Sequence, residues 1–157
     1  MPKKARAIRP LDREKADELL YGSLRSIYHF ERKLVELFGL GFEGIYLLQL
    51  LRRRESARVG EIAAALDLKI FSTTRLVQRL EAAGLVTKER APDDRRAVTV
   101  RLEPAGENLV KAIEAHNFKL IVGAASSLSD AGHKAFILVA ENLERVLGVE
   151  DRVERDR

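Results

Sequence analysis

The sequence contains no cysteine and no tryptophan. Without cysteine the chain can form no disulfide bond, and it has no thiolate for catalysis, for a zinc site or for a peroxide-sensing switch. The three histidines, His29, His116 and His133, have no paired spacing, so no metal ion or cofactor is expected. The chain also lacks a Gly-Lys-Ser/Thr phosphate loop and a Gly-x-Ser-x-Gly elbow. These absences predict that the protein is not an enzyme.

Long apolar runs are missing as well. No stretch approaches the ~20 residues of a membrane span, so no membrane partner is expected. The first ten residues carry charge but no apolar segment, so no signal peptide is visible. These features predict a cytoplasmic protein.

Positive charge is unevenly distributed along the 157 residues, whose net charge is +4. Residues 1–10 contain four basic and no acidic residues, and residues 69–101 contain eight basic against four acidic ones. From residue 103 onward seven basic residues face ten acidic ones. The basic arm and the middle of the chain therefore suit a polyanionic partner, although a solvated surface can gather charge in the same way.

The spacing of apolar residues predicts a mainly α chain with a small β-hairpin. Helices are expected over 11–38, 42–54, 60–66, 71–84, 104–125 and 130–147, an extended link over 56–59, strands over 85–90 and 97–102, and a turn over 91–96. Asp12 and Ser129 are placed to cap two of the helices, and Gly84 is placed to end another. Residues 39–44 match G-x-G-x-x-G, but a helix precedes them, so we interpret them as a helix break and not a dinucleotide loop.

The segment 71–84 is the centre of this pattern. At about 100° per residue, Leu76, Val77 and Leu80 fall on one side of the helix and can pack on a core. The candidate DNA-contacting residues are on or beside the other side: Phe71, Ser72, Thr74, Arg75, Gln78 and Arg79. Hydroxyl, guanidinium and amide groups on a rigid helix are suited to reading base edges, yet alone they fit an ordinary surface helix better.

The neighbouring elements favour DNA binding over an ordinary surface helix. Two short helices joined by the turn at 67–69 form a helix-turn-helix, in which the second helix enters DNA. A hairpin directly after it makes a winged helix. Arg90, Arg95 and Arg96 lie at the expected tip of this wing, placed to reach along phosphates or into a minor groove.

Five segments together resemble the MarR family of bacterial and archaeal regulators. They are residues 60–63, 74–81, 84–86, 92–97 and 102–106, and the most specific part is the wing triplet Asp94-Arg95-Arg96. The resemblance implies that Asp94 orients Arg96 while Arg95 reaches DNA, and that Thr74 and Arg75 face the groove. Phe71 and Thr73 depart from the family pattern, so specificity is expected to differ there; Phe71 either presses on a thymine methyl group or folds back as packing.

The resemblance also implies an assembly and a ligand. Residues 11–40 and 104–148 would form a helical dimerisation domain, 41–103 the winged helix DNA-binding domain, and 1–10 and 149–157 a flexible basic arm and a charged tail. The expected protein is a homodimeric regulator on a pseudo-palindromic operator, most simply a repressor released by a small anionic aromatic ligand. The candidate ligand residues are Tyr21, Arg25, Tyr28 and His29, although interface packing explains the tyrosines more simply. The alternative function is a winged helix that contacts protein and not DNA.

Overall fold

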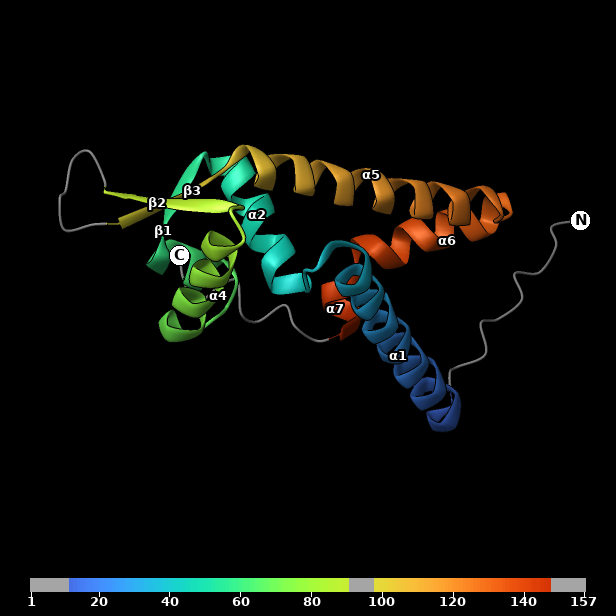
Figure 1. The fold of residues 1–157 in the computed structure, drawn as a ribbon. Helices are drawn as coiled ribbons and strands as arrows, with labels where there is room; N and C mark the ends of the chain where they lie inside the picture. Colours follow the sequence, from blue (N-terminus) through green and yellow to red (C-terminus); the bar gives the residue numbers. More distant parts are fainter. Residues whose placement is uncertain (1–11, 91–97, 148–157) are drawn as a thin grey trace, which may run out of the picture. The chain divides into compact units, whose positions relative to one another are not determined.

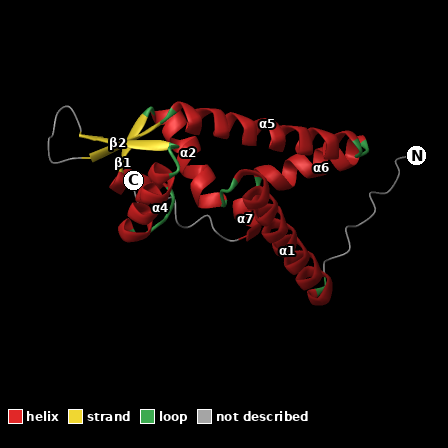
Figure 2. Ribbon diagram, viewed as in Figure 1, coloured by secondary structure: helices red, strands yellow, loops and turns green. Residues whose placement is uncertain are grey.

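A computed structural model describes residues 12–90 and 98–147 of the chain. In chain order the elements are α1 (Arg13–Phe38), α2 (Phe42–Arg54), β1 (Ser56–Arg58), α3 (Val59–Ala65), α4 (Ile70–Ala82), β2 (Val86–Arg90), β3 (Val98–Leu102), α5 (Pro104–Ser126), α6 (Asp130–Glu141) and α7 (Leu143–Leu147). Helices dominate and the strands form one small sheet (Figures 1 and 2), so the predicted fold class is confirmed. The chain divides into two compact units, residues 1–110 and 111–157, which are described separately.

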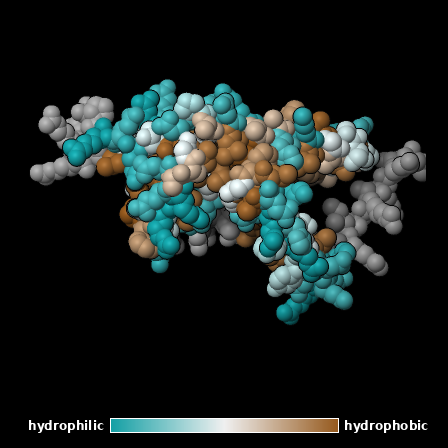
Figure 3. Space-filling model, viewed as in Figure 1, coloured by the Kyte–Doolittle hydropathy of each residue, from teal (hydrophilic) through white to brown (hydrophobic). Residues whose placement is uncertain are grey.

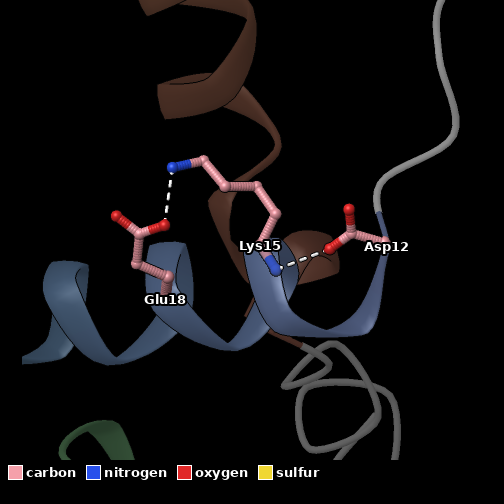
Figure 4. Close-up of polar contacts among 3 residues, drawn as sticks. All are labelled: Asp12, Lys15 and Glu18. Atoms are coloured by element: carbon pink, nitrogen blue, oxygen red, sulfur yellow. Dashed lines mark hydrogen bonds and ion pairs between the residues drawn. The ribbon is translucent and has the colours of Figure 1, made fainter.

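Helix α1 begins where the sequence predicts. The Asp12 carboxylate accepts a hydrogen bond from the Lys15 backbone N–H at 2.8 Å, and Lys15 Nζ lies 2.7 Å from a Glu18 carboxylate oxygen (Figure 4). The helix ends at Gly39, whose φ of 73° lies in the left-handed region that glycine adopts without strain.

No single described helix is long and apolar enough to cross a membrane.

Helix α2 receives its N-terminal cap from α1. Gly41 precedes the helix and has no side chain to offer, whereas Glu31 Oε1 accepts a hydrogen bond from the Phe42 N–H at 2.8 Å. A Cβ atom on Gly41 would lie 2.9 Å from this same oxygen, so glycine leaves room for the cap. The carboxylate also complements the positive end of the α2 dipole.

The core of residues 1–110 surrounds α2. Leu47, Leu48 and Leu51 are fully buried in it. The cluster also contains Ala57, Ile62, Leu76, Val77, Leu80, Val86, Val100 and Val110. Side chains from α2, α3, α4 and all three strands therefore share one hydrophobic cluster, which fixes α4 against the rest of this unit.

The sheet has the order β1-β3-β2, with both pairings antiparallel. The predicted hairpin of β2 and β3 is confirmed, with Val86 opposite Leu102. Residues 56–58, expected to be only an extended link, form a third strand in which Ala57 pairs with Val100. Three residues are too few to show a strand periodicity, so the sequence pattern missed this strand.

The last predicted helix, 130–147, is interrupted. Ser129 caps it as expected, because its Oγ accepts a hydrogen bond from Gly132 N–H at 3.2 Å. However, Asn142 leaves helical geometry at φ −115° and ψ 18°, and its side chain donates to the Leu138 carbonyl at 2.8 Å. An asparagine side chain competes with the backbone for such carbonyls, which explains two helices where one was predicted.

Gly106 allows the start of α5 to approach β2 closely. The Leu85 carbonyl oxygen accepts a hydrogen bond from Glu103 N–H at 3.0 Å, and a Cβ atom on Gly106 would collide with that oxygen. Gly60, in the first turn of α3, has no atom within 4 Å of an added Cβ.

Gly106→Ala is therefore expected to lower the free energy of unfolding by about 2 kcal/mol or more, as overpacking does. Gly60→Ala is the matched control and is expected to change it by less than about 1 kcal/mol. Urea denaturation of both variants measures the difference, and equal midpoints would contradict the close approach at Gly106.

Candidate nucleic-acid interface

Helix α4 has one buried and one exposed side. Leu76, Val77 and Leu80 are buried, as predicted, and Thr73 is 0% exposed beside them. The Thr73 hydroxyl donates to the Lys69 carbonyl at 3.1 Å, which satisfies it inside the core. The expectation that Thr73 contributes to DNA specificity is therefore wrong, because its side chain does not reach the surface.

The exposed side carries most of the predicted contact residues together. A shallow groove is lined by Glu43, Phe71, Ser72, Arg75, Gln78, Arg79 and Ala82. Thr74 is half-buried at the edge of this side, and its hydroxyl donates to the Ile70 carbonyl at 2.8 Å. While this bond is made, its oxygen is available to a base as an acceptor.

Phe71 points outward. Its side chain is 71% exposed, so the alternative that it folds back as core packing is wrong. The Arg75 guanidinium lies over the ring, with Cζ 5.7 Å from the ring centroid. This cation–π contact joins two residues one turn apart and holds the guanidinium at the surface.

Glu43 is a groove residue that sequence reasoning missed. It belongs to the first turn of α2, where an acidic residue ordinarily complements the helix dipole. The fold brings it to the groove beside Arg75 and Arg79. The Glu43 carboxylate repels phosphate. DNA phosphates are therefore expected to contact basic residues away from Glu43.

The C-terminal end of α4 is tied to the sheet. Gly84 adopts a φ of 69°, as predicted, and the Leu85 N–H donates to the Leu80 carbonyl at 2.9 Å. Lys88 Nζ on β2 lies 2.7 Å from a Glu81 carboxylate oxygen on α4. These contacts hold the wing strands at a fixed position relative to α4.

Arg90 is exposed at the end of β2, where the predicted wing tip begins. The other predicted wing residues, Asp94, Arg95 and Arg96, lie outside the described residues. So do the basic arm at 1–10 and the charged tail at 149–157, whose predicted roles stay predictions.

The candidate ligand residues lie along α1. Tyr21 and Tyr28 are both exposed, and the Tyr28 and His29 ring centroids are 5.7 Å apart. A hollow at this helix is lined by Tyr28, Glu31, Arg32, Val35 and Glu36. Of the four predicted ligand residues only Tyr28 lines this hollow; Tyr21, Arg25 and His29 do not, and the basic side chain beside Tyr28 is Arg32. A hydrogen bond with Tyr28, and then the charge of Glu36, raise the pKa of Arg32, which stays protonated.

Arg32 could have been found from the sequence, because it follows Tyr28 by four residues and therefore lies on the same helix face. Nowhere within residues 12–90 and 98–147 do three His, Asp or Glu side chains lie close enough together to hold a metal ion.

The arrangement defines a winged helix-turn-helix protein: α3 and α4 form the helix pair, and β2 and β3 follow as the wing. Comparison with known proteins agrees. The model of the MarR family matches residues 45–98. An uncharacterized HTH-type transcriptional regulator of Bacillus subtilis, YhbI, is 30% identical over 115 residues, covering 71% of this chain and 75% of the relative. The chain belongs to the MarR family and is a transcriptional regulator, not an enzyme.

Solved structures share the fold. The crystal structure of Streptococcus pneumoniae FabT in complex with DNA aligns with a TM-score of 0.74 at 15% identity, over 87% of this chain and 98% of that one. Bordetella bronchiseptica BpsR, whose DNA binding is regulated by 6-hydroxynicotinic acid, aligns with a TM-score of 0.58 at 21% identity, over 81% of this chain and 99% of that one. At these identities the similarity concerns the fold.

The two threonines of α4 test how this helix is oriented. Thr73→Val is expected to leave DNA affinity within about twofold, because residue 73 is buried, whereas Thr74→Val is expected to weaken binding by about three- to tenfold through loss of an acceptor. Fluorescence anisotropy with a labelled operator measures both. A larger loss for Thr73→Val than for Thr74→Val, with both variants folded, would contradict the orientation.

Proposed function

We propose that the protein is a homodimeric repressor that binds a pseudo-palindromic operator through α4 and is released by a small ligand. The observation that carries the proposal is the exposed face of α4. Arg75 and Gln78 project from a helix whose opposite side is buried in the core. A helix with one side anchored and the other offering guanidinium and amide groups can enter a major groove without losing its packing.

Different residues would supply specificity and general affinity. Thr74, Arg75 and Gln78 would read bases, since bidentate contacts to base edges discriminate sequence. Arg90 and, as the family resemblance implies, Arg95 would contact phosphates, with Asp94 orienting Arg96. Each phosphate contact releases counterions, so affinity would fall steeply with salt. In a two-fold dimer the half-sites would lie about one helical turn, ~10 bp, apart.

The proposed dimer is supported by apolar surface in the helices outside the winged helix. Helix α6 has no buried residue, although Phe136, Leu138 and Val139 are large and apolar. On α5, Phe118 and Ile121 are exposed, and Figure 3 shows hydrophobic side chains along this helix on the face in view. Contiguous apolar surface of this kind marks an interface. We assign it to a second copy of the chain, as the family resemblance implies.

Ligand release would act through α1. The hollow beside Tyr28 combines an aromatic ring with the Arg32 guanidinium, which suits an anionic aromatic compound. The neighbouring Glu31 and Glu36 would oppose an anion, so Arg32 must supply most of the attraction. A ligand that prefers one spacing of the two recognition helices would shift the dimer away from the DNA-binding form. Because the sequence has no cysteine, oxidation of a thiol is excluded as the signal.

Two arginines separate base reading from phosphate binding. Arg75→Ala is expected to lower affinity for a specific operator by about tenfold or more and to change affinity for scrambled DNA little. Arg90→Ala is the matched control and is expected to weaken both probes equally, with a salt slope smaller by about one. Gel shifts on both probes at two salt concentrations measure these effects.

Equal losses on the two probes for Arg75→Ala would contradict base reading. If the wild-type protein shifts neither probe, the alternative is favoured, a winged helix that contacts protein. The same experiment therefore separates the two functions.

A charge placed on α6 tests the dimer. Val139, which is 53% exposed, belongs to the apolar surface of α6, and Val139→Asp is expected to shift the protein to monomer and to weaken operator binding more than tenfold. Lys134→Asp, on the opposite side of the same helix, is the matched control and is expected to remain dimeric. Sedimentation velocity at micromolar concentration measures the assembly, and a dimer that survives Val139→Asp would contradict this interface.

A further inference from the structure

Phe71 and Arg75 form one unit at the beginning of α4. They lie one turn apart, and the Arg75 guanidinium carbon is 5.7 Å from the Phe71 ring centroid. Phe71 is 71% exposed and lines the groove on the outer side of α4, so its ring is accessible to a partner that enters the groove. The first residues of a recognition helix are those that approach base edges most closely.

Both side chains are available for DNA. Among the described residues, the contact recorded for the Arg75 guanidinium is the face of the Phe71 ring, which leaves its N–H groups open to an acceptor. The same contact limits the rotamers of both side chains before DNA arrives, so less side-chain entropy is lost on binding.

We propose that this pair reads a thymine–guanine step. Phe71 packs on the C5-methyl group of the thymine, and Arg75 donates two hydrogen bonds to O6 and N7 of the adjacent guanine on the same strand. This inference rests on the proposed function, which is DNA binding through α4. It adds the identity of two neighbouring bases within each half-site.

The chemistry of the major groove supports this assignment. Thymine is the only base that presents a methyl group there, and guanine presents two acceptors that match the fork of a guanidinium. Successive bases on one strand are about 3.4 Å apart along the helix axis. The 5.7 Å between ring and guanidinium lies between one and two such steps, so the two side chains can contact neighbouring bases without separating.

The thymine half of the proposal is tested by removing only the methyl group. An operator is selected from a random DNA pool with the full-length wild-type protein, and each thymine is then replaced in turn by deoxyuridine. At one thymine in each half-site, the wild-type protein is expected to lose about three- to fivefold in affinity, which corresponds to one methyl group returned to water. Phe71→Ala is expected to bind both probes equally.

Ile70→Ala is the matched control, because Ile70 is a neighbouring apolar side chain that is 56% exposed. It is expected to keep the wild-type ratio between thymine and deoxyuridine probes. Since Phe71 and Ile70 are both exposed, the two variants are expected to unfold at the wild-type temperature, which a thermal melt verifies.

The guanine half is tested with 7-deazaguanine beside the responsive thymine. Loss of the N7 acceptor is expected to weaken the wild-type protein by about fivefold or more and to leave Arg75→Ala unchanged. If Phe71→Ala keeps the thymine preference, or if no thymine responds, the inference is overturned while a selected consensus still supports the proposed function. If no consensus emerges and scrambled DNA binds equally well, the proposed function fails and the inference fails with it.

Discussion

The winged helix depends on the burial of one side of α4 against α2 and the sheet. Leu76, Val77 and Leu80 join the core that surrounds Leu48 and Leu51, and none of these side chains is more than 4% exposed. Burying side chains of this size contributes roughly 1.5–3 kcal/mol each relative to leaving them in water. This packing fixes the rotation of α4 about its own axis, and that rotation decides which residues face outward.

The rotation has a direct consequence for specificity. A turn of about 100° would exchange Thr73 for Thr74 at the surface, because successive residues on a helix differ by that angle. The core prevents this exchange, since Thr73 is 0% exposed and its hydroxyl is satisfied by the Lys69 carbonyl. Phe71 and Arg75 face outward for the same reason. Base recognition at the surface of α4 is therefore set by apolar contacts that never touch DNA.

Features encoded by a few neighbouring residues were predictable from the sequence. The caps at Asp12 and Ser129 and the left-handed Gly84 follow from local hydrogen bonding and backbone sterics, and the structure confirms all three. The recognition helix was predictable because its apolar period is long enough to count. The grouping of Phe71, Arg75 and Gln78 at one groove followed from that period.

Features that depend on distant residues were not predictable. The strand at 56–58 exists because β3, more than 40 residues later in the chain, pairs with it. The break at Asn142 is local, but it depends on a competition for the Leu138 carbonyl that leaves no periodic signal in the sequence. Glu43 of α2 lies in the groove with residues of α4 only through the packing of the two helices on one another. Tertiary structure, and not local pattern, decides such positions.

Glu31 lies between the hollow proposed to bind the ligand and the α4 surface proposed to bind DNA. Its side chain lines the hollow that contains Tyr28 and Arg32, and it also lines a second hollow beside α4 that includes Leu76 and Arg79. Between these hollows, Glu31 Oε1 holds the first N–H of α2 at 2.8 Å. The next residue of α2, Glu43, lies in the groove with Arg79. An anionic ligand in the hollow beside Tyr28 would repel the Glu31 carboxylate. A displaced Glu31 would leave α2 without its cap and disturb the groove directly, without a long chain of intermediate residues.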